Sequence, residues 1–334
     1  MTTCCKRAAF FLFPKRSDEW VALLRVGLGV EVVLYCLSEW SGWIDALSSN
    51  SSALSARRVS EALLSLESTL IPRVDWLLKP AGHLGLREST LLWMVWSVLV
   101  LSGLLLTLGL FCRPAAVTAW LLHLVCLKSS DMFAYGMDNF VSIGLFYLML
   151  SPLPDSYSIE SRIWKIRLRN ARMVGFFRRA LQLHLCIIYF FSGLAKSLGT
   201  DWWNGLNIWA AVTRPPFNVF DPILIAHWRF LLPAVGITIC LIEIGYPIFI
   251  WPRRTRPIWL TCVLAMHGAI GIAMGMYLFG LIMIILNLAA FAPHWIFRQR
   301  TPSYRIAKPE INPSLTAFGS TNPPVFYQND QVKR

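Results

Sequence analysis

Long apolar runs separated by short polar segments dominate this chain, and several of them approach the roughly 20 residues that a helix needs to cross a bilayer. The third, fourth and eighth runs are short, so we expect these helices to be tilted or partly enclosed by the others. The pattern predicts an all-α, polytopic transmembrane helical bundle with about eight spans, at residues 21–43, 91–111, 114–127, 139–152, 180–198, 229–251, 258–276 and 279–293.

Composition agrees with a membrane protein. The 334 residues are 56% hydrophobic and only 15% charged, and their mean hydropathy is +0.53. Soluble chains carry about 25% charged and about 45–50% apolar residues. A soluble enzyme, a disulfide scaffold and a disordered protein are therefore excluded.

Most of the 31 Lys and Arg residues fall in segments that the predicted spans place on the same side of the membrane. These segments include the first sixteen residues and the loop 162–179. Because cytoplasmic loops collect such residues, both termini are predicted to be cytoplasmic, in the cell (inner) membrane. Topology thus accounts for the net charge of +13, and no nucleic-acid partner is needed. The first span is too long for a signal peptide and is predicted to be an uncleaved membrane anchor.

This orientation divides the chain into three parts. Residues 1–19 form a basic cytoplasmic N-terminus, 20–295 form the transmembrane domain, and 296–334 form an irregular, Pro-containing cytoplasmic tail. Within the domain, 44–90 is the longest outer loop. Its amphipathic stretch around Ala62–Leu78 is predicted to lie along the outer membrane face.

The eight cysteines form no CxxC pair and no cluster with zinc spacing, so no metal site is predicted. Most lie singly in apolar segments, where a cysteine serves as a small hydrophobic residue. Cys36 and Cys126 both lie near predicted outer helix ends. A disulfide between them and two separate thiols are both compatible with the sequence.

Ionisable residues at membrane depth are costly, so each one is a candidate functional residue. They are Arg25, Glu31, Asp138, His184, Lys196, Glu243 and His267. For Glu243 the simplest structural explanation is a partner such as Arg25 or His267, and for Glu31 we expect a partner on another helix. His267 shares its span with several glycines and is alternatively a packing residue.

The fifth span carries its polar residues on one helical face: Gln182, Cys186, Tyr189, Ser192, Gly193 and Lys196 recur at spacings of three and four. That face must point toward the interior of the helix bundle or toward a water-filled cavity. Lys196 lies roughly 25 Å beyond Arg179, near the predicted outer boundary. It is either a lysine that extends to the headgroups or a partly desolvated amine with a functional role.

A series of motifs carries a family resemblance. Tyr135-Gly136-Met137-Asp138-Asn139 leads into an apolar run that ends in Leu150-Ser151-Pro152. The block Tyr189-Phe190-Phe191-Ser192-Gly193-Leu194-Ala195-Lys196 follows, then Asp201-Trp202-Trp203-Asn204-Gly205, then Glu243 with Pro247, and His267. In this order they resemble the HTTM family, the membrane domain shared with vitamin K-dependent gamma-carboxylase, over most of residues 20–295.

The resemblance implies that Lys196 is the base that acts on a reduced, vitamin K hydroquinone-like quinone. Asp138 and His267 join Lys196 as implied catalytic residues, while Tyr189, Gln182, Glu243 and Trp202 are the implied cofactor-binding residues. The cavity that they line is expected to face outward. Asp138 stands where the carboxylase has a catalytic histidine, and the large lumenal domain of the carboxylase has no counterpart here.

The expected function is therefore quinone-dependent oxidation or modification of a peptide, with a secreted peptide or protein as the partner. Two alternatives remain. One is a non-catalytic maturation or assembly partner for a secreted peptide, as the resemblance to shorter SdpB-like proteins implies. The other is a DoxX-like, quinone-linked redox subunit.

Overall fold

The computed structural model describes residues 3–14, 16–49, 56–67, 70–130, 134–166, 170–215 and 219–292. These residues form α-helices and one short 3-10 helix, and they contain no β-strand. All the described residues belong to one compact unit. The predicted cytoplasmic tail, 296–334, lies outside the described residues.

A helix occupies each of the eight predicted spans. The bounds of these helices are α2 (Glu19–Ser38), α6 (Glu88–Leu108), α7 (Cys112–Ser129), α8 (Gly136–Leu150), α10 (Ala171–Ser197), α14 (Leu232–Phe249), α15 (Arg256–Met274) and α16 (Tyr277–Phe291). Among the described residues, five helices are long and apolar enough to cross a membrane: α2, α6, α10, α14 with the preceding 3-10 turn, and α15. That all eight cross remains a prediction, as does the side on which the termini lie.

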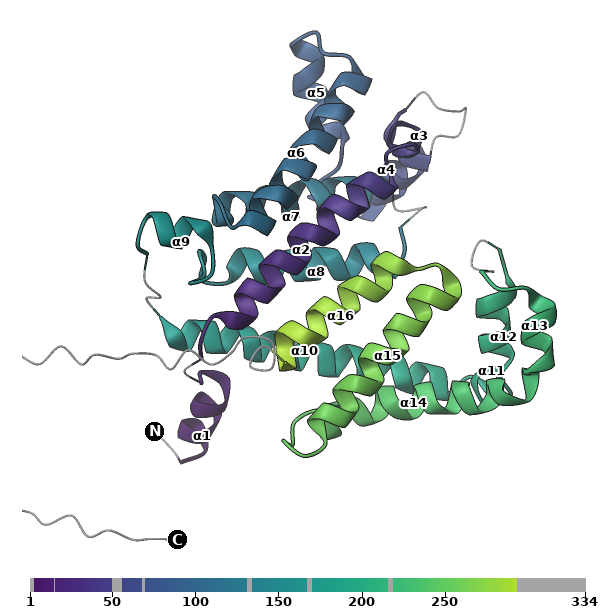
Figure 1. Cartoon of the computed structure of the whole chain (residues 1–334). Helices are drawn as coiled ribbons and strands as arrows, with labels where there is room; N and C mark the ends of the chain where they lie inside the picture. Colours follow the sequence, from purple (N-terminus) through teal and green to yellow (C-terminus); the bar gives the residue numbers. More distant parts are fainter. Residues whose placement is uncertain are drawn as a thin grey trace, which may run out of the picture. The chain divides into compact units, whose positions relative to one another are not determined.

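The helices pack in two groups that α16 connects. In the first group α2 packs against α6 and α8, and α7 lies between α6 and α8. In the second group α10 packs along α14, and α15 packs along α16. Because α16 also packs against α2, the two groups share a helix, as Figure 1 shows.

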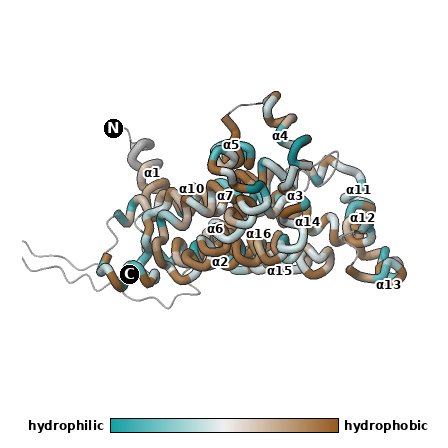
Figure 2. Tube along the Cα trace, turned by 90° about the horizontal axis from the view of Figure 1, so that it is seen from above, coloured by the Kyte–Doolittle hydropathy of each residue, from teal (hydrophilic) through white to brown (hydrophobic). Residues whose placement is uncertain are grey.

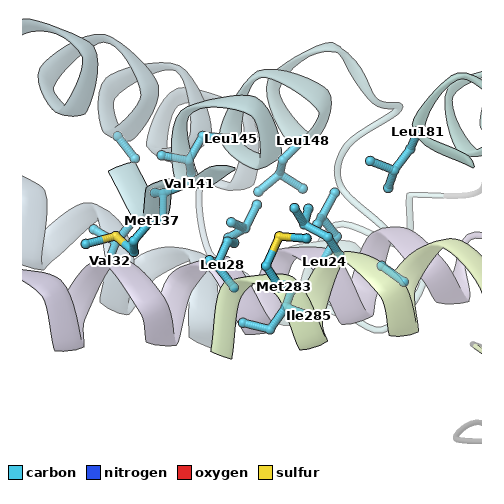
Figure 3. Packing of buried hydrophobic residues seen from close by; sticks show 14 of the residues in the cluster. Leu24, Leu28, Val32, Met137, Val141, Leu145, Leu148, Leu181, Met283 and Ile285 are labelled. Atoms are coloured by element: carbon cyan, nitrogen blue, oxygen red, sulfur yellow. The ribbon is translucent and has the colours of Figure 1, made fainter. Parts of the chain in front are cut away.

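Apolar side chains from α2, α8 and α16 fill the centre of the unit (Figure 3). Leu24, Leu28 and Val32 follow each other at spacings of four on α2 and are almost fully buried. They meet Val141, Leu145 and Leu148 of α8 and Met283 and Ile285 of α16. Hydrophobic residues predominate along α2 and α15 in Figure 2.

Close contacts through glycine bring neighbouring helices together. A Cβ on Gly29 of α2 would lie 2.6 Å from the Thr107 backbone nitrogen of α6. A Cβ on Gly193 of α10 would lie 2.8 Å from both the Glu243 Cβ and the Ile244 nitrogen of α14. The second contact positions the candidate site, because it presses the polar face of α10 onto α14.

The predicted outer segment 44–90 contains α3 (Trp43–Leu47), α4 (Ala56–Glu67) and α5 (Asp75–His83). The amphipathic stretch around Ala62–Leu78 is thus divided between two helices, with Pro72 in the connection. Helix α4 packs on α7, and the Ser129 hydroxyl of α7 donates to Glu61 over 2.8 Å.

Short helices complete the unit. They are α1 (Thr3–Leu12), α9 (Ile159–Ile163), α11 (Thr200–Trp203), α12 (Leu206–Thr213), α13 (Pro222–His227) and the 3-10 helix η1 (Arg229–Leu231). Helices α11 and α12 both pack against α14. A Cβ on Gly236 of α14 would lie 2.2 Å from the Trp202 carbonyl oxygen, so only glycine permits α11 to approach this closely.

A buried ion pair joins the start of α2 to the loop before α9. Arg25 is 2% exposed and Asp155 is fully buried, with 2.6 Å between Nε and Oδ2. The Arg25 guanidinium also donates to the Leu106 and Thr107 carbonyls at the end of α6. Gly109 ends α6 with φ +77°, and a Cβ there would lie 2.8 Å from the guanidinium. Arg25 is thus paired with Asp155, which excludes it as one of the two partners that the sequence suggested for Glu243.

Glu31 contradicts the expectation of a partner on another helix. Its side chain is fully buried on α2, and neither carboxyl oxygen has a hydrogen-bond partner among the described residues. A buried polar group without a partner costs free energy because it has lost its hydration.

We therefore expect Glu31→Met to raise the free energy of unfolding by about 1–3 kcal/mol, since it replaces an unpaired polar group with an apolar side chain of similar size. The midpoint of thermal unfolding in detergent measures this. Glu243→Met is the matched control, because it removes a paired carboxylate of α14 and should lower the midpoint. A lower midpoint for Glu31→Met would mean that Glu31 has a stabilising partner.

The cysteines of the described region are separate thiols. Cys36 and Cys126 are both buried and are free, so the structure contains no disulfide between them. Of the two interpretations that the sequence leaves open, two separate thiols match the structure.

Candidate functional site

Lys196 and Glu243 form an ion pair between α10 and α14. The Lys196 ammonium lies 2.7 Å from Oε2 and 3.0 Å from Oε1 of Glu243 and also donates to the Ser192 hydroxyl. The Lys196 side chain is 23% exposed and that of Glu243 is 7% exposed. Ser192 is one turn before Lys196, which places both on the same helical face. Glu243 is therefore paired with Lys196, and not with Arg25 or His267.

The ion pair lies at mid-helix depth on α14. At 1.5 Å per residue, Glu243 is about 17 Å from the start of α14 and about 9 Å from its end. Because Gly193 has no side chain, α10 contacts α14 directly at Glu243, and this contact brings Lys196 within reach of the Glu243 carboxylate. The contact favours a partly desolvated ion pair over a lysine that extends to the headgroups.

Trp202 completes the surroundings of Lys196. The short helix α11 begins three residues after α10 ends, and it turns the Trp202 ring toward the ammonium, which lies 5.4 Å from the ring centroid. A cation at this distance interacts favourably with the negative face of an indole ring. The cluster therefore holds the lysine from three directions, with a carboxylate, a hydroxyl and an aromatic ring.

A hydrogen-bond chain lies beside the ion pair. Tyr246 donates to Asn287 Oδ1 over 2.7 Å, and Asn287 Nδ2 donates to the Tyr189 hydroxyl over 2.8 Å. The Tyr189 hydroxyl lies 2.8 Å from His267 Nε2, and the Tyr189 and Tyr246 rings stack with centroids 4.2 Å apart. Four helices, α10, α14, α15 and α16, each contribute one residue to this buried chain.

The chain is compatible with one tautomer of His267 in particular. The Asn287 amide nitrogen donates both to Tyr189 and to the Met283 carbonyl, so the Tyr189 hydroxyl accepts there and has its own hydrogen free for His267 Nε2. In that arrangement the imidazole hydrogen is on Nδ1. His267 is 3% exposed, and its Nδ1 has no partner among the described residues. A buried ring nitrogen is thus left unused by the described residues.

Asp138 lies in a different cluster. It lies in the first turn of α8, where its carboxylate accepts the Tyr135 backbone N–H over 3.0 Å and its carbonyl contacts His123 Nε2 over 3.1 Å. It lines a cavity of about 320 Å³ together with Tyr35, Glu39, Trp43 and others. Burial raises the pKa of the Glu39 carboxyl, and the charge of Asp138 adds to this. The expected single cavity containing Asp138 and Lys196 is not observed.

Gln182 is also distant from Lys196. The two share a face of α10 but are fourteen residues apart, or about 21 Å along the helix. Gln182 donates to the Ala290 carbonyl over 2.6 Å and accepts from Arg179 over 2.9 Å. The structure thus brings together Lys196, Glu243, Trp202, Tyr189 and His267 of the predicted site residues, and it separates Asp138 and Gln182 from them.

An apolar cavity of about 590 Å³ borders the same helices. Its walls come from α12, α14 and α15, and polar atoms contribute almost nothing to them. Ile242 and Met266 line it and are the chain neighbours of Glu243 and His267. Lys196 is not among the lining residues.

Sequence reasoning missed three members of the site: Asn287, Tyr246 and the direct role of Ser192. Asn287 could have been noticed, because it is an amide in the otherwise apolar helix α16. The described residues contain no group of His, Cys, Asp and Glu that could hold a metal ion.

Comparisons with known proteins identify no relative. No protein-family model, no curated protein and no solved structure matches the chain.

Proposed function

We propose that this chain is a multi-pass membrane protein that binds a reduced, quinone-like ring next to Lys196 and His267, and that Lys196 acts as the base on it. The buried, unpartnered His267 Nδ1, in the same helix group as the Lys196–Glu243 ion pair, carries the proposal. The HTTM resemblance, eight spans and cytoplasmic termini are parts of the same proposal.

The residues present fit such a ring. A buried donor without a partner is costly, and a ring oxygen of the ligand would accept from it. The apolar cavity beside Ile242 and Met266 would take a hydrophobic side chain on the ring, as ligand sites that are mostly apolar with few polar groups do. Trp202 supplies an aromatic face close to the lysine.

A reduced quinone, when bound, supplies acidic ring hydroxyls and an electron pair that can react with oxygen. The chain's residues handle the proton. Lys196 would take up a proton at its nitrogen while giving one of its own to Glu243 Oε2, 2.7 Å away. His267 would hold the ring through Nδ1, with Tyr189 donating to Nε2.

Two substitutions of His267 test the ligand contact. Asn carries its amide nitrogen near the position of Nδ1, whereas Gln reaches the position of Nε2 instead. We expect His267→Gln to weaken binding of a reduced naphthoquinone about tenfold or more and His267→Asn to retain most of it. Binding is measured by tryptophan fluorescence quenching in nanodiscs, with thermal unfolding as the check on folding.

Turnover is measured on the same samples, as oxygen-dependent formation of the naphthoquinone epoxide. Equal binding by both folded variants would contradict the His267 contact. If the folded wild-type protein binds no quinone at all, the enzyme proposal is wrong and a non-catalytic maturation partner becomes the better explanation.

A further inference from the structure

A second pocket, far from Lys196 on α10, contains a concentration of positive charge. We call it the arginine pocket. It has a volume of about 220 Å³ and is lined by Phe11, Pro14, Arg16, Gly175, Arg178, Arg179, Gln182, Trp251 and Arg256. Three separate parts of the chain contribute: the end of α1 with the connection to α2, the N-terminal half of α10, and the connection from α14 with the first residue of α15.

No carboxylate is among the lining residues. Arg16, Arg179 and Arg256 all act on the Arg178 guanidinium with like charge, and the one acid that acts on it, Glu19, lies outside the pocket and accepts from Ser17. Four guanidiniums that repel one another, with a single acid outside the pocket to offset them, are unfavourable unless an anion joins them.

Neutral groups hold these arginines in place. Arg178 Nε donates to the Ala290 carbonyl over 2.9 Å, and Arg256 donates to the Ile250 and Trp251 carbonyls. Arg179 donates to the Phe11 carbonyl and lies over the Phe11 and Trp251 rings. Backbone carbonyls and rings orient the side chains but do not neutralise their positive charge.

Donor groups remain available in the pocket. Within the part of the chain that the structure describes, the terminal nitrogens of Arg178 have no protein acceptor, and the Arg16 side chain has none either. Guanidinium groups match the oxygens of phosphate in geometry and charge. Trp251, at the end of α14, and Phe11 add apolar surface at the edge of a membrane-spanning helix, where lipid headgroups lie.

We propose that the arginine pocket binds a phosphate group, held by Arg16 and Arg178 with Arg179 and Arg256 beside them. Basic pockets between membrane helices bind anionic lipid headgroups in this way. The phosphate belongs either to an anionic phospholipid or to a soluble phosphate compound. The site is independent of the quinone proposal.

The experiment uses purified full-length protein in detergent, with the midpoint of thermal unfolding and lipid retention in native mass spectrometry as readouts. Phosphatidylglycerol, phosphatidylcholine and inorganic phosphate with phosphatidylcholine are added in separate titrations. The variants are Arg16→Gln, which changes an exposed side chain, and Arg16→Gln/Arg178→Gln. Arg172→Gln is the matched control, because Arg172 is an exposed arginine of α10 outside the pocket.

We expect phosphatidylglycerol to stabilise the wild-type protein and Arg172→Gln, and its affinity to fall at least tenfold in the double variant. Saturation by inorganic phosphate alone would support the site with a soluble phosphate as its source. The proposal is overturned if neither phosphate source stabilises the wild-type protein. It is equally overturned if Arg172→Gln loses as much affinity as the pocket variants.

Discussion

Lys196→Ala is expected to abolish quinone turnover and to destabilise the protein at the same time. Removal of a base in the reaction costs about 10²–10⁴-fold in rate. Removal of the ammonium also leaves the Glu243 carboxylate, which is 7% exposed, without its partner. Breaking a buried pair from one side costs about 3–5 kcal/mol. Epoxide formation in nanodiscs measures the first effect, and thermal unfolding measures the second.

A double variant separates the two effects. Lys196→Met with Glu243→Leu replaces both charges with apolar side chains, so no buried charge is left unpaired. We expect it to regain most of the lost stability and none of the lost turnover. Recovery of turnover in this variant would remove Lys196 from the chemistry, and an unchanged stability in Lys196→Ala would contradict the buried ion pair.

The second large effect is expected at the Arg25–Asp155 pair. Asp155→Asn keeps the shape of the side chain but leaves the 2% exposed guanidinium without a counter-charge. We expect a loss of about 3–5 kcal/mol in the free energy of unfolding, because the remaining charge has no water to replace its partner. The loss is measured by chemical or thermal unfolding in detergent. Unfolding is detected by the reaction of the buried cysteines with a maleimide dye.

An exposed pair is the control for this measurement. Lys79 and Asp75 are 3.1 Å apart on α5, but their side chains are 72% and 38% exposed. Lys79→Ala should therefore change stability by less than about 1 kcal/mol, as surface pairs do. Comparable losses in both variants would contradict the difference in burial on which the expectation rests.

The positions of the helices could be predicted because long apolar runs carry that information locally. Helix α10 shows where this stops: its apolar run starts near residue 180, but the helix begins at Ala171. The Asn170 side chain caps that end, and α1 and the segment that follows it pack on the polar first turns. The sequence could not indicate that contact, since it joins residues more than 150 positions apart.

The sequence could predict only those parts of the candidate site that lie on one face of a single helix. Spacing correctly placed Tyr189 and Lys196 on one face of α10. It could not show that Gln182, on the same face, ends beside arginines about 21 Å away. The pairing of Lys196 with Glu243 and of Tyr189 with Asn287 depends on which helices are neighbours, and no pattern within a single helix determines this.

The position of Asp155 also constrains the order of assembly during synthesis. Arg25 enters the membrane with α2, yet its counter-ion is 130 residues later in the chain. Until that loop is made, the guanidinium bears an insertion cost of about 2.5–3.5 kcal/mol. The first four predicted spans are therefore expected to remain loosely associated, open to chaperones and insertion factors, until residues 151–158 close them into a finished unit.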